Sequence, residues 1–319
     1  MSDRTGSRPE IGAALSLTDF PDRLSPVFVR DLRRALRTPF LVASFVVLQA
    51  LAFLAVIVES GISALFTGGP VSFAVALPVV TSIMFGFALP LAHFNSLQSE
   101  MGPGRNAELL VTARLSLRQI VGGRILVASS VSAVLLVSLL PYFLIRYFLG
   151  GTELPGLFHS MIGLFLTNTV TNAIVIGLSA FSNVVGRVVL FVWLISTYQS
   201  FHAPYHVLAS AMPGFASPII DSVGIVLVAA LFTKIGWQLG MSKLRRLEDP
   251  HEHAGSVLIL LTVCLFFPFI HFVALAMGGA TAGILSVGLM FVMMRGLAPG
   301  LTRKKELKPA APAPPFPNP

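Results

Sequence analysis

Cysteine, charged side chains and nucleotide-binding motifs are all scarce or absent in this 319-residue chain. The single cysteine, Cys264, lies within an apolar run, which excludes an intrachain disulfide and a cysteine metal cluster. Charged residues make up only 11% of the chain against 55% hydrophobic residues. Such a composition cannot surround one soluble core without exposing large apolar patches, so a soluble enzyme is excluded.

Phosphate-binding loops are also missing from the sequence. It contains neither GxxxxGK[ST] nor a GxGxxG that follows a strand, so it encodes no P-loop and no dinucleotide site. We therefore predict no catalytic residue and no cofactor in this chain, and any nucleotide hydrolysis must come from another chain. We also expect no secretory signal, because seven arginines and five acids precede the first apolar stretch.

Long apolar runs dominate what is present. Each is near the roughly 20 residues that a helix needs to cross a hydrocarbon core of about 30 Å. Backbone groups find no water there, so runs of this length must be helical. We predict an all-α, polytopic membrane protein of about eight spans, with apolar runs near residues 40–60, 72–94, 124–149, 157–181, 187–209, 217–240, 255–277 and 280–298.

Basic residues partition strongly across these spans. Of the 22 lysines and arginines, all but Arg146 and Lys234 fall on one side. The positive-inside rule then places both termini in the cytoplasm, and we expect a multi-pass protein of the bacterial plasma (inner) membrane. The net charge of +8 is explained by orientation and by anionic lipid headgroups rather than by nucleic acid.

The first 38 residues are predicted to form a cytoplasmic segment with an amphipathic helix over 24–37. Its arginines, at positions 30, 33, 34 and 37, occupy the face opposite an apolar stripe, so the helix should lie in the membrane surface. Thr38-Pro39 disfavours continuation into the bilayer and predicts a sharp bend. The remaining predicted regions are a six-span core (39–241) with a cytoplasmic loop (95–124), a cytoplasmic linker (242–254), a two-span hairpin (255–298) and a disordered, proline-rich tail (299–319).

Polar residues inside the predicted spans are the candidates for a substrate path. Asn168, Thr171 and Asn172 share one helical face, where they either line such a path or form hydrogen bonds that hold span four to its neighbours. Gln199 belongs to a polar stretch of span five, which is therefore broken, re-entrant or buried. Asp221 is the only acid that we place within a span, and it is either a functional acid or one solvated by water and headgroups.

Histidines raise the question of a metal site. His202 and His206 are four residues apart, and His251-Glu252-His253 lies in a cytoplasmic turn. Pro204 interrupts the first pair and no third ligand is near, so we predict no bound metal. An alternative function is nevertheless a membrane-embedded enzyme for a lipid or isoprenoid, with His202, His206 and Asp221 converging. A structural anchor that recruits partners through the proline-rich tail is a third possibility.

Two stretches of the first 240 residues resemble the permease subunits of type-2 ATP-binding-cassette (ABC) exporters. SPVFVRDLRRALRTPFLVASFVVLQ at 25–49 is similar to that family's N-terminal elbow and first span, and NAELLVTARLSLRQIVGGRILVA at 106–128 to its loop between spans two and three. Ala113-Arg114 stands where the family commonly has a proline. The resemblance implies an exporter that pairs with a second copy or a homologous permease, and whose partner ATPase holds ATP and Mg. It implies that the ATPase docks on a coupling surface made of Arg30, Arg33, Arg34, Arg37, Glu100, Arg105, Glu108, Leu109, Leu110, Arg114 and Arg118.

Overall fold

The computed structural model describes residues 26–66, 76–98, 117–149, 153–211 and 216–248, together with 273 and 292. Within these ranges the chain is helical and contains no strand, which confirms the predicted all-α fold for this part of the protein. The tail, most of the hairpin at 255–298 and most of the loop at 95–124 lie outside the described residues.

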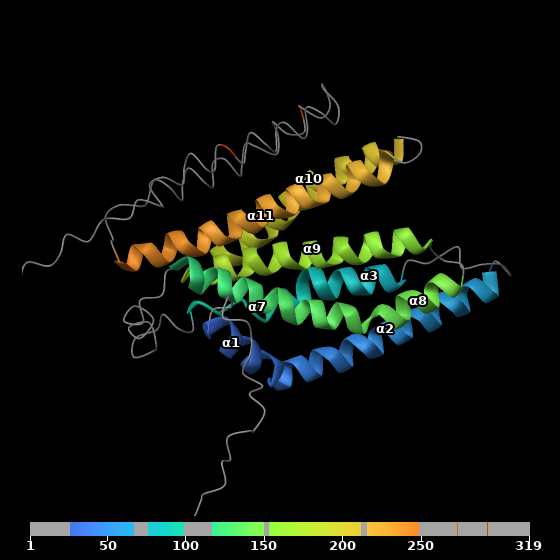
Figure 1. Ribbon diagram of the computed structural model, residues 1–319, viewed down its shortest axis with the longest axis horizontal. Coiled ribbons are helices and arrows are strands. Elements are labelled where there is room, and N and C mark those ends of the chain that lie inside the picture. Colours follow the sequence, from blue (N-terminus) through green and yellow to red (C-terminus); the bar gives the residue numbers. More distant parts are fainter. Residues whose placement is uncertain are drawn as a thin grey trace, which may run out of the picture.

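The helices run side by side as a layered bundle (Figure 1). The middle of the bundle is α9, with α10 and α11 on one side and α7, α8 and α2 on the other. In chain order the elements are α1 (Pro26–Leu36), α2 (Pro39–Phe66), α3 (Ala76–Ile83), the π-helix η1 (Met84–Ala88), α4 (Leu89–Leu91), α7 (Leu117–Ser138), α8 (Leu140–Phe148), α9 (Leu154–Leu178), α10 (Val184–Ala211) and α11 (Ala216–Glu248).

Five helical segments in the described part of the chain are long and apolar enough to cross a membrane. They identify an integral, multi-pass membrane protein. The segment Ala76–Leu91 is apolar and helical but shorter, and the last two predicted spans fall in the hairpin outside the described residues. The five segments are Pro39–Ile62, Arg118–Phe148, Leu154–Leu178, Val184–Phe201 and Asp221–Ser242.

Helix α1 is separate from α2, and the break falls at Arg37 and Thr38. Pro39 is the first residue of α2, where its missing N–H costs nothing. The Thr38 hydroxyl donates to the carbonyl oxygen of Ala35 at 2.7 Å and so satisfies the end of α1. The bend predicted from Thr38-Pro39 therefore has a local physical cause.

The third and fifth predicted spans differ from each other in continuity. The third run, expected as one helix over 124–149, is divided at Leu139 into α7 and α8. Pro141 lies in the first turn of α8, and it cannot donate to the carbonyl four residues earlier in α7. Span five, expected to be broken, re-entrant or buried, is not broken, because α10 is one continuous helix over Val184–Ala211, and Thr197 and Tyr198 of its polar stretch are buried.

Helices α9 and α11 approach closely through small residues. Ala173 and Gly177 on α9, and Gly236 and Gly240 on α11, each recur at four-residue spacing. A methyl group at Gly177 would overlap the carbonyl of Gly236, and one at Gly236 would lie only 2.7 Å from the backbone nitrogen of Ile174. The backbones of the two helices are therefore in direct contact, and neither glycine can gain a side chain without moving one helix.

Candidate functional site

A cavity of about 550 Å³ lies beside α9 and is the best candidate for a functional site. From His159 to Thr171 it follows α9 for roughly 18 Å at 1.5 Å per residue, more than half of a hydrocarbon core. Its walls come from α3, η1, α8, α9, α10 and α11. The lining residues are Pro78, Thr81, Ser82, Ile83, Gly86, Phe87, Phe143, Arg146, His159, Ser160, Gly163, Leu164, Thr167, Thr171, Ile195, Gln199 and Ile225.

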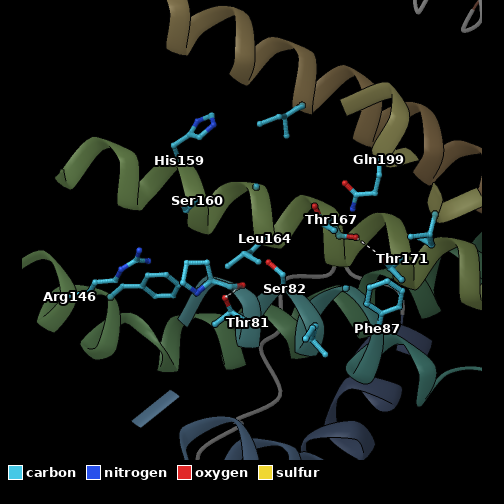
Figure 2. Close-up of a pocket in the computed structure, with 17 residues that line it drawn as sticks. Thr81, Ser82, Phe87, Arg146, His159, Ser160, Leu164, Thr167, Thr171 and Gln199 are labelled. Carbon is cyan, nitrogen blue, oxygen red and sulfur yellow. Dashed lines mark hydrogen bonds between the residues drawn. The ribbon is translucent and has the colours of Figure 1, made fainter. Parts of the chain in front are cut away.

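The two ends of this cavity differ in chemistry (Figure 2). Arg146 and His159 lie at one end, which we call the basic end. Thr167, Thr171 and Gln199 lie at the other end and offer uncharged hydrogen-bonding groups. Since the middle of the lining is largely apolar, the cavity suits an elongated amphipathic molecule.

The basic end is built on a buried ion pair. Arg146 on α8 lies 3.7 Å (Nε to Oε2) from Glu59 on α2, and both side chains are buried. The other carboxylate oxygen of Glu59 accepts a hydrogen bond from the backbone N–H of Leu77 at 2.8 Å, at the start of α3. Glu59 therefore joins α2, α3 and α8 at one point. Our prediction that Asp221 is the only acid within a span is wrong, because Glu59 lies inside the first predicted run.

The second buried acid, Asp221 on α11, pairs with His159 on α9. Nε2 of His159 lies 2.8 Å from Oδ2 of Asp221, and Nδ1 lies 3.4 Å from the Ser222 hydroxyl. A carboxylate can only accept, so Nε2 of His159 carries the proton that Oδ2 of Asp221 accepts. Asp221 is only 7% exposed, so the histidine accounts for its environment better than solvent does. His159 was not among the predicted site residues, and its signal in the sequence was a histidine near the start of the apolar run at 157–181.

The polar cluster on α9 divides between packing and the cavity. Asn168 and Asn172 are buried, and Nδ2 of Asn172 donates to Oδ1 of Asn168 at 2.7 Å. Thr167 and Thr171 instead line the cavity, and the Thr167 hydroxyl lies 3.1 Å from that of Tyr198 on α10. Both alternatives for this cluster thus apply, each to different residues.

Asn168 also explains why η1 is stable. In π geometry the carbonyl of Phe85 points to residue 90, which is Pro90 and has no N–H. Nδ2 of Asn168 donates to that carbonyl at 2.6 Å and replaces the missing donor. The widened turn is therefore held from α9, and it forms the cavity wall at Gly86 and Phe87.

A buried arginine secures the opposite end of the bundle. Arg187, at the start of α10, is 2% exposed, and its Nη1 donates to the Phe94 carbonyl at 2.7 Å and to Oδ1 of Asn95 at 2.9 Å. Its guanidinium also lies 4.5 Å from the centre of the Phe94 ring. The Ser179 hydroxyl accepts from the Leu97 N–H at 3.1 Å. The turn at 92–97 is consequently fixed to both α9 and α10.

Part of the predicted coupling surface is visible. The arginines of α1 and the turn after it (30, 33, 34 and 37) are exposed, as is Arg118 at the start of α7. The other predicted residues lie outside the described part: Glu100, Arg105, Glu108, Leu109, Leu110 and Arg114. The same is true of the side chains of His202 and His206 and of residues 251–253. Among the residues that the structure describes, no three histidine, cysteine or acidic side chains are grouped to hold a metal.

Comparisons with protein families, with curated proteins and with solved structures found no match to this chain. Function is therefore inferred from the cavity, the buried ion pairs and the sequence pattern.

Proposed function

We propose that this chain is the membrane-spanning permease subunit of an ABC exporter, driven by a separate cytoplasmic ATPase. The observation that carries the proposal is the cavity beside α9, which is long, largely apolar and polar at both ends within the span region. A conduit of this kind fits an amphipathic cargo whose polar group rests at one of its two ends. Lipid-linked glycans, drugs and peptides are the classes to test.

In the proposed topology, α1 is an elbow helix in the cytoplasmic membrane surface, and α2 to α11 form the six-span core. The short segment Ala76–Leu91 is then the second span. The hairpin at 255–298 adds two spans, for eight in total, and both termini face the cytoplasm of a bacterial cell. The basic end of the cavity faces the outer side, because His159 and Asp221 lie near the non-cytoplasmic ends of their helices.

The proposed source of energy is a partner ATPase that holds ATP and Mg and docks on α1 and on the loop at 95–124. That loop leads directly into α7, which packs on α1 and α9. Movement of the loop can therefore reach the cavity wall through rigid helices, which is the physical requirement for coupling. The permease itself pairs with a second copy or with a homologous permease in this proposal.

A cavity-filling substitution tests the conduit. The protein would be copurified with its ATPase, identified by mass spectrometry, and placed in nanodiscs with panels of amphipathic compounds. Gly163→Phe fills the cavity at a site with nothing within 4 Å of a new Cβ, whereas Gly156→Phe is a matched control on the same helix outside the cavity. We expect Gly163→Phe to lose compound-stimulated ATP hydrolysis and Gly156→Phe to keep it. Equal stimulation in both variants would refute the conduit.

A charge reversal tests the coupling surface. Glu108→Arg combined with Arg118→Glu should uncouple ATP hydrolysis from transport without preventing membrane insertion. Transport per ATP is measured in proteoliposomes that contain the complete complex. Fully coupled transport by the double variant would count against the role of the loop.

One observation favours the alternative, a membrane-embedded enzyme acting on a lipid or isoprenoid. The His159–Asp221 pair faces a cavity and has the geometry of an oriented base. The discriminating experiment incubates the purified chain alone with lipid and isoprenoid substrates. Turnover that His159→Gln abolishes would establish the enzyme and overturn the permease.

A further inference from the structure

A second cavity, of about 460 Å³, lies where α1 meets α7 and the turn after α4. We call it the arginine cavity, because guanidinium groups converge on it from two helices. Its polar lining consists of Arg30, Asp31, Arg34, Thr38, His93, Ser96 and Arg124. It belongs to neither the cavity beside α9 nor the basic end, and it lies at the opposite end of α9, near Ile176.

Charge in the arginine cavity is unbalanced. Among the described residues that line it, three arginines stand against one carboxylate, Asp31, which already pairs with Arg30 at 2.9 Å. Nη1 of Arg124 donates to the Ser96 carbonyl at 2.6 Å, so this guanidinium is held in place from the turn at 92–97. An excess of fixed positive charge in a concave site selects an anion.

His93 also lines the arginine cavity. It lies in the turn after α4, outside the membrane-spanning helices, where burial and then the positive charge of Arg124 lower its pKa to about 4. The imidazole is therefore neutral at cellular pH and can donate a hydrogen bond without adding charge. Together with Thr38 and Ser96 it provides uncharged groups beside the arginines.

Exposed apolar side chains flank the lining residue Thr38 in the sequence. Thr38 lines the cavity, and its neighbours Leu36 and Phe40 are 42% and 47% exposed. Further along α2 the exposed surface continues as apolar side chains such as Val42 and Phe45. A ligand with a phosphate in the cavity would thus have a hydrocarbon-facing helix beside it for acyl chains.

We infer that the arginine cavity binds the phosphate group of an anionic phospholipid, whose acyl chains lie along α2. Basic pockets between membrane helices on the cytoplasmic side bind such headgroups. A bound lipid bridges α1 and α7 and holds α1 against the bundle. Arg33 and Arg37 do not line the cavity, so the arginines of α1 divide between a lipid site and the remaining exposed surface. This inference does not depend on the proposed transport function.

Native mass spectrometry of the full-length chain in mild detergent tests the site. Phosphatidylglycerol and phosphatidylcholine are titrated separately, and inorganic phosphate is added in a third arm. We expect one retained phosphatidylglycerol that phosphatidylcholine does not replace. Arg34→Gln should weaken the affinity for phosphatidylglycerol about fivefold, and Arg34→Gln/Arg124→Gln about 25-fold. Each arginine near a lipid surface contributes about a fivefold factor in affinity.

Arg37→Gln is the matched control, because it removes the same charge from the turn after α1 without touching the cavity. If Arg124→Gln prevents folding, the comparison of Arg34→Gln with Arg37→Gln decides by itself. Equal losses in those two variants, or equal retention of the two lipids, would overturn the site. Displacement of the lipid by millimolar inorganic phosphate would overturn the lipid assignment and point to a soluble phosphate compound.

Discussion

The contact between α9 and α11 makes the sharpest prediction, because a single methyl group tests it. In Gly236→Ala the new Cβ would lie 2.7 Å from the Ile174 nitrogen and closer still to the Ala173 backbone, whereas ordinary contacts begin at 3.4 Å. The helices must therefore separate by at least 0.7 Å at this point. The obstructing atoms are backbone, so no side-chain rotation can relieve the overlap.

The expected cost is at the upper end of the range for overpacking, about 2–3 kcal/mol. For a chain of this size we expect the midpoint of thermal unfolding to fall by roughly 3–5 °C. The midpoint is measured as loss of the monodisperse size-exclusion peak after heating in mild detergent.

Gly123→Ala on α7 is the matched control, since nothing lies within 4 Å of its new Cβ. Removing a glycine from a helix interior should raise stability by about 0.5–1 kcal/mol. The two variants thus carry the same chemical change with opposite expected signs. If Gly236→Ala unfolds at or above the temperature of Gly123→Ala, the close approach of α9 and α11 is refuted.

Three further predictions concern buried polar groups, each measured by the same thermal assay. Glu59→Leu removes the buried ion-pair partner of Arg146 and should cost about 3–5 kcal/mol, whereas Glu59→Leu/Arg146→Leu should recover part of that loss; no recovery would show that the pair is not coupled. Asn168→Leu removes the donor to the Phe85 carbonyl and should cost about 1–3 kcal/mol, while an unchanged midpoint would mean that another group supplies that donor. Arg187→Lys should destabilise by about 1–2 kcal/mol because an ammonium lacks the planar group that lies over the Phe94 ring, and a neutral result would contradict that geometry.

Hydrophobic run length was enough to predict the helices, because lipid leaves the backbone no other partner. The break at Thr38-Pro39 was predicted from the proline itself, whose effect on the backbone is local. The division of the third run at Leu139 had an equally local cause in Pro141, yet run length alone did not reveal it. The two helix breaks thus have the same kind of cause, but only the one at Pro39 was predicted, because Pro141 lies inside a continuous apolar run.

The site was less predictable, because its residues acquire their roles from partners far away in the sequence. Glu59 meets Arg146, and His159 meets Asp221, across separations that no periodicity encodes. The cluster at 167–172 was visible as polar residues in an apolar run, but its split between packing and cavity depends on where η1 and α10 lie. The sequence likewise did not indicate that Gly177 and Gly236 lie where the backbones of α9 and α11 are in contact.

The hydrogen bond from Asn168 to the π-turn has a mechanical consequence. The carbonyl of Phe85 accepts its hydrogen bond from Asn168 of α9 rather than from its own helix. If η1 slid along α9, this buried carbonyl would therefore lose its donor. We expect these two walls to move as one body during any gating motion. The side on which η1 can separate from its neighbours then lies toward α10, where Phe87 meets Phe191 through an edge-on ring contact at 6.2 Å. Two aromatic rings can part and close again without leaving a polar atom unsatisfied.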